Sequence, residues 1–596
     1  MVRMPEPIEH YALLADCRSA ALVGRRGSID WLCLPRFDSA SLFARILGEE
    51  THGHWTVRPV DAESCDERHY VDDTFTLVTR WTTPTGAVDV IDLMPRAGEH
   101  PAIIRRIVGV RGSVAMEQLL RIRFDYASAM PWVRQVGTDE APHLLALAGP
   151  DAVSVRGPRF RPIDHAHRAE LTVNEGEIVD TVMQWFPGEE DPPDALDVDA
   201  AIDHTEHWWR AWANACDPPG AYDDHVRRSL LVLRALTHEQ TGGIVAAPTT
   251  SLPETMGGSR NWDYRFVWLR DAALTLEALM LHGYGDEALG WRDWLLRAIA
   301  GDPEDVQIMY GINGERRLPE WEIDSLPGYA GSAPVRAGNG AYTQFQGDVF
   351  GEVMIALEDA RELGIEEDSF SWSLQVKLLE WVETQLDRYD NGIWEIRGPE
   401  QVFTHSRVML WAAFDRGIDG VRRFGLDGPA DRWKRVRDSL AEEIERLGFD
   451  AERGHYRQHY ATTEVDASLL QLAHVGYVAP DDPRMVGTVA EIERTLLRDG
   501  LPLRYRTSSG VDGLEGEEHP FLACAFWLVE QYARSGRLDD ADALMTRLTS
   551  LSNDVGLLSE EYDTAHERHM GNTPQALSHL ALVRAADAIA AARGAE

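Results

Sequence analysis

One glutamate in this chain lies between apolar neighbours on a predicted loop, where its carboxyl could donate a proton. Glu395 lies between Trp394 and Ile396, after the turn signal Asp-Asn-Gly and before an amphipathic segment that begins at Thr404. Apolar neighbours remove water from a carboxyl, which favours its neutral form and raises its pKa. The alternative is a solvated surface acid, because most glutamates are exposed. From this stretch alone, Glu395 is a candidate proton donor.

Further carboxylates lie on two other predicted loops. Glu560 and Glu561 follow a helical segment and a Gly turn, and they precede the last predicted helix, which begins at Pro574. Glu320 and Glu322 lie in a long Gly- and Pro-rich segment, a kind of loop that is usually functional or disordered. Either pair could instead be solvated. If they are not solvated, a carboxylate of either pair could replace Glu395 as the proton donor or act together with it.

The densest group of polar and aromatic residues is the stretch GGSRNWDYRFVWLRDAALTLEAL, which begins at Gly257. Arg270 and Asp271 could bind sugar hydroxyls in pairs, and Tyr264 and Trp268 could stack on the apolar face of a sugar ring. Asp271 could instead cap the helix that starts near it. Two carboxylates beside an apolar-walled sugar pocket are what glycoside hydrolysis requires. The sequence lacks GxSxG, HExxH and a phosphate-binding Gly-rich loop, so it does not predict the chemistries that need them.

The composition of the 596 residues is that of a globular protein, with 44% hydrophobic and 26% charged residues. Because 98 acidic residues outnumber 58 basic ones, a net charge of −40 disfavours nucleic acid and membrane surfaces as partners. Five scattered cysteines show no CxxC or Cys/His spacing, so we predict no disulfide framework, no metal and no other cofactor. The start of the chain has no secretory-signal pattern, and no stretch of about 18 apolar residues occurs, so we expect a cytoplasmic protein.

Hydrophobic periodicity divides the chain into two parts. Strand-length segments, such as 102–110 and 116–126, fill the first part and favour an antiparallel β-sandwich over residues 1–198. Residues 199–222 are predicted to form a helical linker. About a dozen amphipathic segments follow over residues 223–596. Their spacing of roughly thirty residues suits stacked helix hairpins, and the lack of a strong repeat favours a closed helical barrel over a solenoid.

Five motifs together resemble glycoside hydrolase family fifteen, which contains glucoamylases and bacterial trehalases. In chain order they are RNWDYRFVWLRDA, PVRAGNGAY, GIWEIRG with FTHSRVMLWAAFDR, EEHPFLACAFWLVE and GNTPQALSHLAL. GRRGSIDWLCLPRFDSASLFARIL also resembles the start of the family's N-terminal domain, so the resemblance covers nearly the whole chain. It implies a mainly α fold, in which an (α/α)6 helical barrel follows an antiparallel β-sandwich domain.

The resemblance also implies roles for individual residues. The family's general acid is the Glu that follows Trp in the third motif, which is Glu395 here. Its general base is the first Glu of a pair before the last helix, which is Glu560 here. The implied substrate-binding residues are Tyr264, Trp268, Arg270, Asp271, Trp394 and Arg336.

These residues predict an exo-acting, inverting α-glucoside hydrolase whose partner is a small carbohydrate substrate. We expect α,α-trehalose as that substrate, because neither a secretion signal nor an appended starch-binding module is visible. The first alternative is a glucoamylase that acts on α-1,4- or α-1,6-oligosaccharides. Two less favoured alternatives are a sugar phosphorylase and a non-catalytic regulatory domain. Two departures from the family pattern concern the acceptor side: Asp324 and Ser325 lie where relatives usually carry His, and Thr573 and Leu577 replace aromatic residues.

Overall fold

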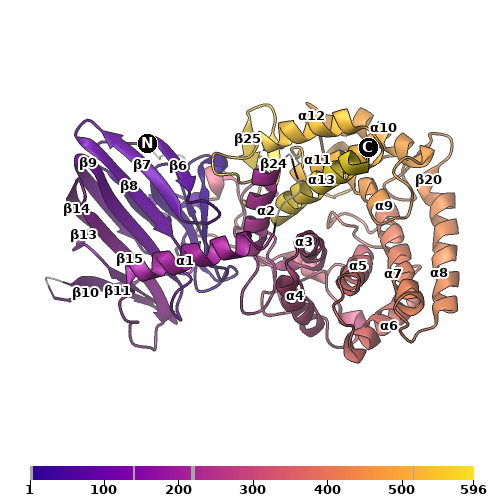
Figure 1. The fold of residues 1–596 in the computed structure, drawn as a ribbon, viewed down its shortest axis with the longest axis horizontal. Helices are drawn as coiled ribbons and strands as arrows, with labels where there is room; N and C mark the ends of the chain where they lie inside the picture. Colours follow the sequence, from indigo (N-terminus) through magenta and orange to yellow (C-terminus); the bar gives the residue numbers. More distant parts are fainter. Residues whose placement is uncertain (1–4, 139–140, 217–219, 221, 515, 596) are drawn as a thin grey trace.

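Figure 1 shows two parts side by side, a strand part from the start of the chain and a helical part from the rest. Helix α1 (Val198–Ala213) lies along the strand part and leads into the helical part. The prediction of an antiparallel sheet domain followed by a helical region is therefore confirmed. The computed structural model describes residues 5–138, 141–216, 220, 222–514 and 516–595.

Antiparallel pairing joins the strands of the first part into one sheet. Its main path runs β1–β2–β3–β5–β9–β15–β12–β11–β10, and the remaining strands pair at its sides. The strands are β1 (Ala12–Ala15), β2 (Ala20–Val23), β3 (Ser28–Cys33), β4 (Ser41–Phe43), β5 (His54–Pro59), β6 (Glu67–Tyr70), β7 (Leu77–Thr83), β8 (Gly86–Leu93), β9 (Ala102–Arg121), β10 (Trp132–Gly137), β11 (Pro142–Ala148), β12 (Asp151–Arg156), β13 (Arg161–Ile163), β14 (Ala166–Asn174) and β15 (Ile178–Pro187).

The longest strand, β9, connects two halves of this sheet. Its first half pairs with β8 and β15, and its second half pairs with β5 and β14. The prediction of separate strands at 102–110 and 116–126 is wrong, because backbone pairing continues through the residues between them. The buried rings of Trp31, Trp55 and Trp81 come from β3, β5 and β7 and share one hydrophobic core. A strand that buries one face shows the alternating pattern seen in the sequence.

The helices of the second part alternate with loops that carry short strand pairs. Within the described residues, no helix combines the length and the apolar character that a membrane crossing needs. The helices are α2 (Asp223–Ala235), α3 (Leu269–Leu281), α4 (Gly285–Ala298), α5 (Asp348–Glu362), α6 (Ser369–Thr384), α7 (Thr404–Arg422), α8 (Ala430–Glu443), α9 (Gln471–His474), α10 (Pro483–Thr495), α11 (Leu522–Arg534), α12 (Leu538–Thr549) and α13 (Ala576–Ala595). The paired short strands are β16 (Val267–Trp268) with β17 (Met309–Tyr310), β18 (Trp321–Glu322) with β19 (Arg336–Ala337), β20 (Phe449–Asp450) with β21 (His455–Tyr456), β22 (Leu497–Arg498) with β23 (Leu501–Pro502), and β24 (Glu561–Asp563) with β25 (Arg568–Met570).

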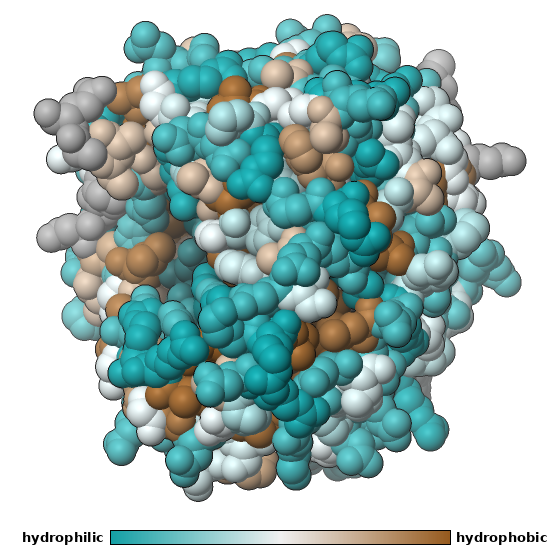
Figure 2. Space-filling model, turned by 90° about the vertical axis from the view of Figure 1, so that its right-hand side faces the viewer, coloured by the Kyte–Doolittle hydropathy of each residue, from teal (hydrophilic) through white to brown (hydrophobic). Residues whose placement is uncertain are grey.

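Helix contacts in the second part form a closed cycle. Helix α3 packs against α5, α5 packs against α7, and the cycle continues through α9 and α11 to α13, which returns to α3. These helices are largely buried, and in α11 every residue from Leu522 to Ala533 is buried. Helix α8 lies outside the cycle and buries only Trp433 and Leu440. Figure 2 shows that the face of the helical part remote from the strands is largely hydrophilic, with apolar side chains in small separate groups.

Loops of the helical part are bound to the strand part by buried hydrogen bonds. Arg265 donates hydrogen bonds to the Ser39 carbonyl and to the Tyr126 hydroxyl, both at 2.7 Å. The Tyr329 hydroxyl donates to the Glu6 carbonyl at 2.9 Å. The strand part therefore fixes two loops that precede helices of the cycle, α3 and α5.

Candidate active site

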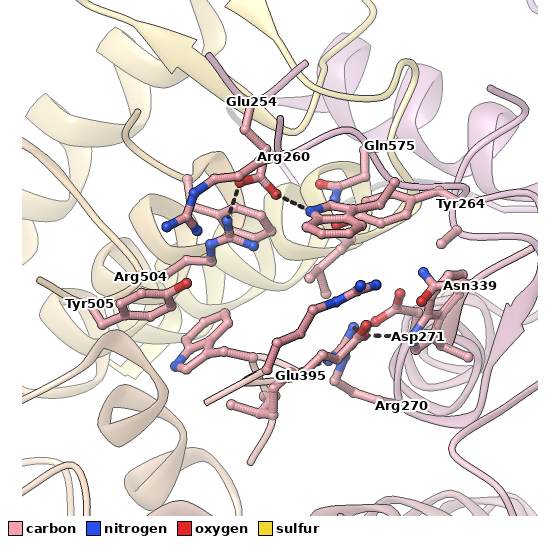
Figure 3. A pocket seen from close by; sticks show the side chains of 18 of the residues that line it. Glu254, Arg260, Tyr264, Arg270, Asp271, Asn339, Glu395, Arg504, Tyr505 and Gln575 are labelled. Atoms are coloured by element: carbon pink, nitrogen blue, oxygen red, sulfur yellow. Dashed lines mark hydrogen bonds and ion pairs between the residues drawn. The ribbon is translucent and has the colours of Figure 1, made fainter. Parts of the chain in front are cut away.

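The loops that precede the helices of the cycle surround a cavity that, together with its opening to solvent, holds about 740 Å³ of empty space. Figure 3 shows Glu395, Arg270 and Asp271 on one side of it, and Glu254, Arg260 and Arg504 on the other. Residues that are hundreds of positions apart meet here because the loops before α3, α5, α7, α11 and α13 all contribute to the wall. The lining residues are Ala246, Glu254, Arg260, Trp262, Tyr264, Trp268, Arg270, Asp271, Asn339, Ile393, Trp394, Glu395, Arg397, Arg504, Tyr505, Leu514, Phe521, Trp527, Gln575 and Leu577.

The loop before α7 directs Glu395 into the cavity by anchoring its two neighbours. Ile396 is buried beside Phe403, and the Trp394 indole N–H donates a hydrogen bond to Asp466 at 2.9 Å. Glu395 itself has a φ of 58°, a left-handed conformation that costs a non-glycine residue about 1–3 kcal/mol. The anchored neighbours hold this conformation, so the apolar residues beside Glu395 serve as supports and the carboxyl faces the cavity.

The surroundings of Glu395 favour a proton on its carboxyl. Burial raises the pKa of Glu395, and the Arg270 guanidinium, 3.9 Å from its Oε1 atom, opposes that rise. The Asp271 carboxylate raises the pKa further. The Trp268 indole N–H donates a hydrogen bond of 2.6 Å to Oε1 and thereby fixes the orientation of the carboxyl.

Arg270 and Asp271 form a buried ion pair on the wall beside Glu395. The Arg270 Nε atom lies 2.7 Å from Asp271 Oδ1, and its Nη1 atom donates to the Ile393 carbonyl at 2.6 Å. Asp271 is the third residue of α3, and its carboxyl makes no cap at the start of that helix. The ion pair offers a fixed carboxylate and guanidinium to hydroxyl groups in the cavity.

Glu560 is buried next to the cavity, 1% exposed, and contacts the lining residue Tyr264. Its Oε1 atom accepts a hydrogen bond of 2.6 Å from the Tyr264 hydroxyl, and its Oε2 atom accepts one of 3.3 Å from the Asn572 N–H. A Cβ at Gly571 would clash with the Glu560 carboxyl, and Gly571 has a φ of 75°, so glycine is required there. Burial raises the pKa of Glu560 to about 8, and the Glu254 carboxylate adds to the rise.

Tyr264 and Trp268 link the two carboxyls across the wall. Their rings meet edge to face with centroids 5.4 Å apart. Each ring donates one hydrogen bond, Tyr264 to Glu560 and Trp268 to Glu395. The two candidate carboxyls are therefore oriented by adjacent aromatic residues of one short stretch.

A buried charged cluster forms the opposite wall. Arg504 lies 3.0 Å from Glu254, 3.0 Å from Glu518 and 3.2 Å from Glu561, and Arg260 donates to Glu518 at 2.6 Å. Burial raises the pKa of Glu254 and of Glu561, and Arg504 opposes the rise in both. Asp512 lies 2.5 Å from Arg260, so four carboxylates contact two guanidinium groups, and this excess of acids agrees with the raised pKa of Glu254 and Glu561.

The structure brings most of the predicted site residues together. Six of them line the cavity: Tyr264, Trp268, Arg270, Asp271, Trp394 and Glu395. Glu560 is not among the lining residues and accepts a hydrogen bond from one of them, Tyr264. Arg336 does not line the cavity; its guanidinium lies 4.6 Å from the centre of the Trp262 ring and donates to the Ser259 and Asn261 carbonyls.

The rival carboxylates have other surroundings. Glu322 is exposed, and Glu320 forms a bidentate ion pair with Arg397, whose side-chain hydrogen bond lowers the pKa of Glu320 against the effect of burial. The motif analysis missed Glu254, Arg397 and Arg504, which have no local pattern that marks them. Among the described residues, no group of three or more His, Cys, Asp or Glu is arranged to hold a metal ion.

Comparisons with known proteins add a family and a fold. The profile described as Glycosyl hydrolases family 15 matches residues 220–587, and the profile described as Trehalase-like, N-terminal matches residues 2–161. The chain is 34% identical to a trehalase of Mycobacterium tuberculosis over 97% of this chain and 89% of that protein. It is 32% identical to a trehalase of Thermoplasma acidophilum over 95% of this chain and 97% of that protein. A crystal structure of a bacterial glucoamylase with acarbose shares the fold, with a TM-score of 0.73 at 13% identity, and the match covers 99% of this chain and 95% of the other.

Proposed function

This chain belongs to glycosyl hydrolases family 15, and we propose that it hydrolyses α,α-trehalose to two molecules of glucose. The observation that carries this proposal is the pairing of two carboxyls with adjacent rings of one cavity, Glu395 with Trp268 and Glu560 with Tyr264. The choice of trehalose is supported by the trehalases that are similar to nearly the whole chain.

In the proposed mechanism, Glu395 is the general acid and protonates the glycosidic oxygen. Glu560 is the general base and takes a proton from the water that attacks the anomeric carbon from the opposite face. This arrangement inverts the configuration and needs a separation of roughly 6.5–9.5 Å between the two carboxyls, which leaves room for the water. The Arg270–Asp271 pair binds hydroxyl groups of the non-reducing glucose, and the rings of Tyr264, Trp268 and Trp394 form the surface around it.

The pKa shifts set opposite demands for the two groups. Glu395 must hold its proton, and burial favours that. Glu560 must be ionised, but with its pKa raised to about 8 only a minor fraction carries the charge at neutral pH in the free enzyme. Activity therefore needs Glu560 ionised and Glu395 protonated at the same time, and it falls on both sides of the pH range in which the two states coexist.

We further infer that the cycle of helices is the inner ring of an (α/α)6 barrel and that the strand part is a β-sandwich. The closed order of helix contacts and the two halves of the sheet joined by β9 support this. The corresponding domain division is 1–198, 199–222 and 223–596. In this division Arg336 contributes to substrate binding indirectly, by supporting the Trp262 ring that lines the cavity.

Glucose release from trehalose, maltose, isomaltose and maltotetraose tests the proposal. We expect trehalose to be the best substrate. Proton NMR at early times should show α- and β-glucose in equal amounts, because inversion converts one of the two α-linked units and leaves the other unchanged. An enzyme that is active on maltose and inactive on trehalose would refute the proposed substrate. Phosphate-dependent formation of glucose 1-phosphate would identify a phosphorylase instead.

A further inference from the structure

Arg397 marks the mouth of the cavity. Of the described residues that line the cavity, it alone is exposed, whereas Asp271 on the inner wall is only 4% exposed. The Arg397 guanidinium lies 4.0 Å from the centre of the Trp262 ring. Its Nη2 and Nη1 atoms lie 2.6 Å and 3.1 Å from the two carboxylate oxygens of Glu320. The loop that carries Glu395 is thus tied at the mouth to a loop from elsewhere in the chain.

Glu320 is held firmly on its own side. Its Oε2 atom accepts a hydrogen bond of 3.0 Å from the Gly340 N–H, and Arg336 Nε lies 3.5 Å from its Oε1 atom. Arg336 and Arg397 both contact the Trp262 ring, so the ring and the carboxylate share the same two guanidinium groups. Bidentate pairs of this kind are the strongest and most directional ion pairs.

The strand part supports the segment that follows Glu320. The exposed Trp321 ring meets the Tyr126 ring edge to face, with centroids 5.9 Å apart. The Ser325 hydroxyl donates to the Tyr126 carbonyl at 2.9 Å, and the Gly328 N–H donates to the Leu47 carbonyl at 2.9 Å. The carboxylate at the mouth therefore belongs to a segment fixed on the strand part.

We propose that the Arg397–Glu320 pair, together with Trp262, closes the acceptor side of the cavity, so that the site accepts a disaccharide and excludes longer α-glucans. The inference rests on the proposed function, in which the non-reducing glucose occupies the inner wall and the second sugar lies at the mouth. In trehalose the anomeric carbons of both sugars are in the scissile bond, so the second sugar has no extension from that carbon. In a maltooligosaccharide the next sugar is attached to the anomeric carbon of the second sugar, so the chain would meet the Arg397–Glu320 ion pair.

Competition by maltose and by maltotetraose tests this proposal, with whichever disaccharide the enzyme hydrolyses as the substrate. We expect the Ki of maltotetraose to exceed that of maltose at least ~10-fold in the unmodified enzyme, a difference of about 1.4 kcal/mol. Arg397→Ala and Glu320→Ala should each bring the two values to within about threefold, because specificity that arises from exclusion is lost with the excluding group. Glu322→Gln is the matched control and should leave the ratio unchanged, since its carboxylate is exposed.

Two results would overturn the proposal. One is a ratio near one in the unmodified enzyme, and the other is an unchanged ratio in both variants while their melting temperatures show that they fold. Both are independent of the bond that the enzyme prefers. If the enzyme hydrolyses maltose and not trehalose, the proposed substrate is wrong, and the ratio still decides whether the ion pair limits chain length.

Discussion

Replacement of Tyr264 by Phe should raise the pKa of Glu560 and lower activity most where that carboxyl is largely protonated. The substitution removes the hydroxyl that donates a 2.6 Å hydrogen bond to Glu560 and keeps the ring that meets Trp268. A hydrogen bond to a charged group contributes about 1.5–3 kcal/mol, which corresponds to roughly one to two pKa units. That bond stabilises the ionised carboxylate, so its loss raises the pKa of Glu560 above the present value of about 8.

The expected loss depends on pH. At pH 7 the ionised fraction of Glu560 should fall by roughly 10- to 100-fold, and kcat/KM should fall with it. The fold loss should be nearly constant well below the pKa of Glu560 in the unmodified enzyme, about 8, and should shrink at pH values above it. The assay is kcat/KM for trehalose at half-unit pH intervals. Tyr505→Phe is the control, because it removes a hydroxyl of the cavity lining that donates to Glu518, and it should change the pH profile less. A loss for Tyr264→Phe that does not shrink at pH values above the pKa of Glu560, about 8, would refute the reasoning.

Three further predictions concern single residues. Glu395→Gln and Glu560→Gln should each lower kcat by ~10²–10⁴-fold, because the amide can neither supply nor accept the proton; near-normal kcat in either variant would contradict its assigned role. Trp268→Phe should raise the pKa of Glu395 by removing its hydrogen bond, and the limb of the pH profile that Glu395 sets should move to higher pH while the other limb stays. Arg265→Ala should lower stability by about 3–5 kcal/mol, since it leaves a buried carboxylate unpaired. Calorimetry should show a clear drop in melting temperature for it, and almost none for Arg494→Ala, whose ion pair is exposed.

The local chemistry of Glu395 could be predicted from the sequence because it depends on adjacent residues. Trp394 and Ile396 indicate a desolvated carboxyl, and burial does raise its pKa in the structure. Their actual role differs in detail, since both side chains are anchored elsewhere and turn the carboxyl into the cavity. The sequence shows which residues are next to Glu395, but the direction of its side chain depends on the folded backbone.

The wall opposite Glu395 could not be predicted because its pairs join distant segments. Arg504 meets Glu254 and Glu561 through the packing of three separate loops, and no short motif encodes such a contact. Arg336 shows the converse limit. An arginine is a suitable residue type for binding sugar hydroxyls. Pairing of β18 with β19, however, places Arg336 opposite Glu322, and its guanidinium contacts the Trp262 ring without lining the cavity. The sequence also predicts two strands where the structure has the single strand β9. Pairing with four neighbouring strands keeps β9 extended through residues whose local pattern is weak.

Asp263 connects the strand part with the residue that orients the proposed base. Its carboxylate binds Arg265, which donates to the Tyr126 hydroxyl and the Ser39 carbonyl of the strand part, and it also accepts a hydrogen bond from the Gly338 N–H at 3.1 Å. The next residue, Tyr264, orients Glu560. Asp263 is thus held by two separate segments, and the backbone that it fixes carries the hydroxyl on the proposed base. A buried ion pair adds little net stability by itself, because desolvation offsets its attraction. The benefit of this costly arrangement is therefore positional: the strand part fixes the loop before α3, and that loop sets the geometry of the proposed base.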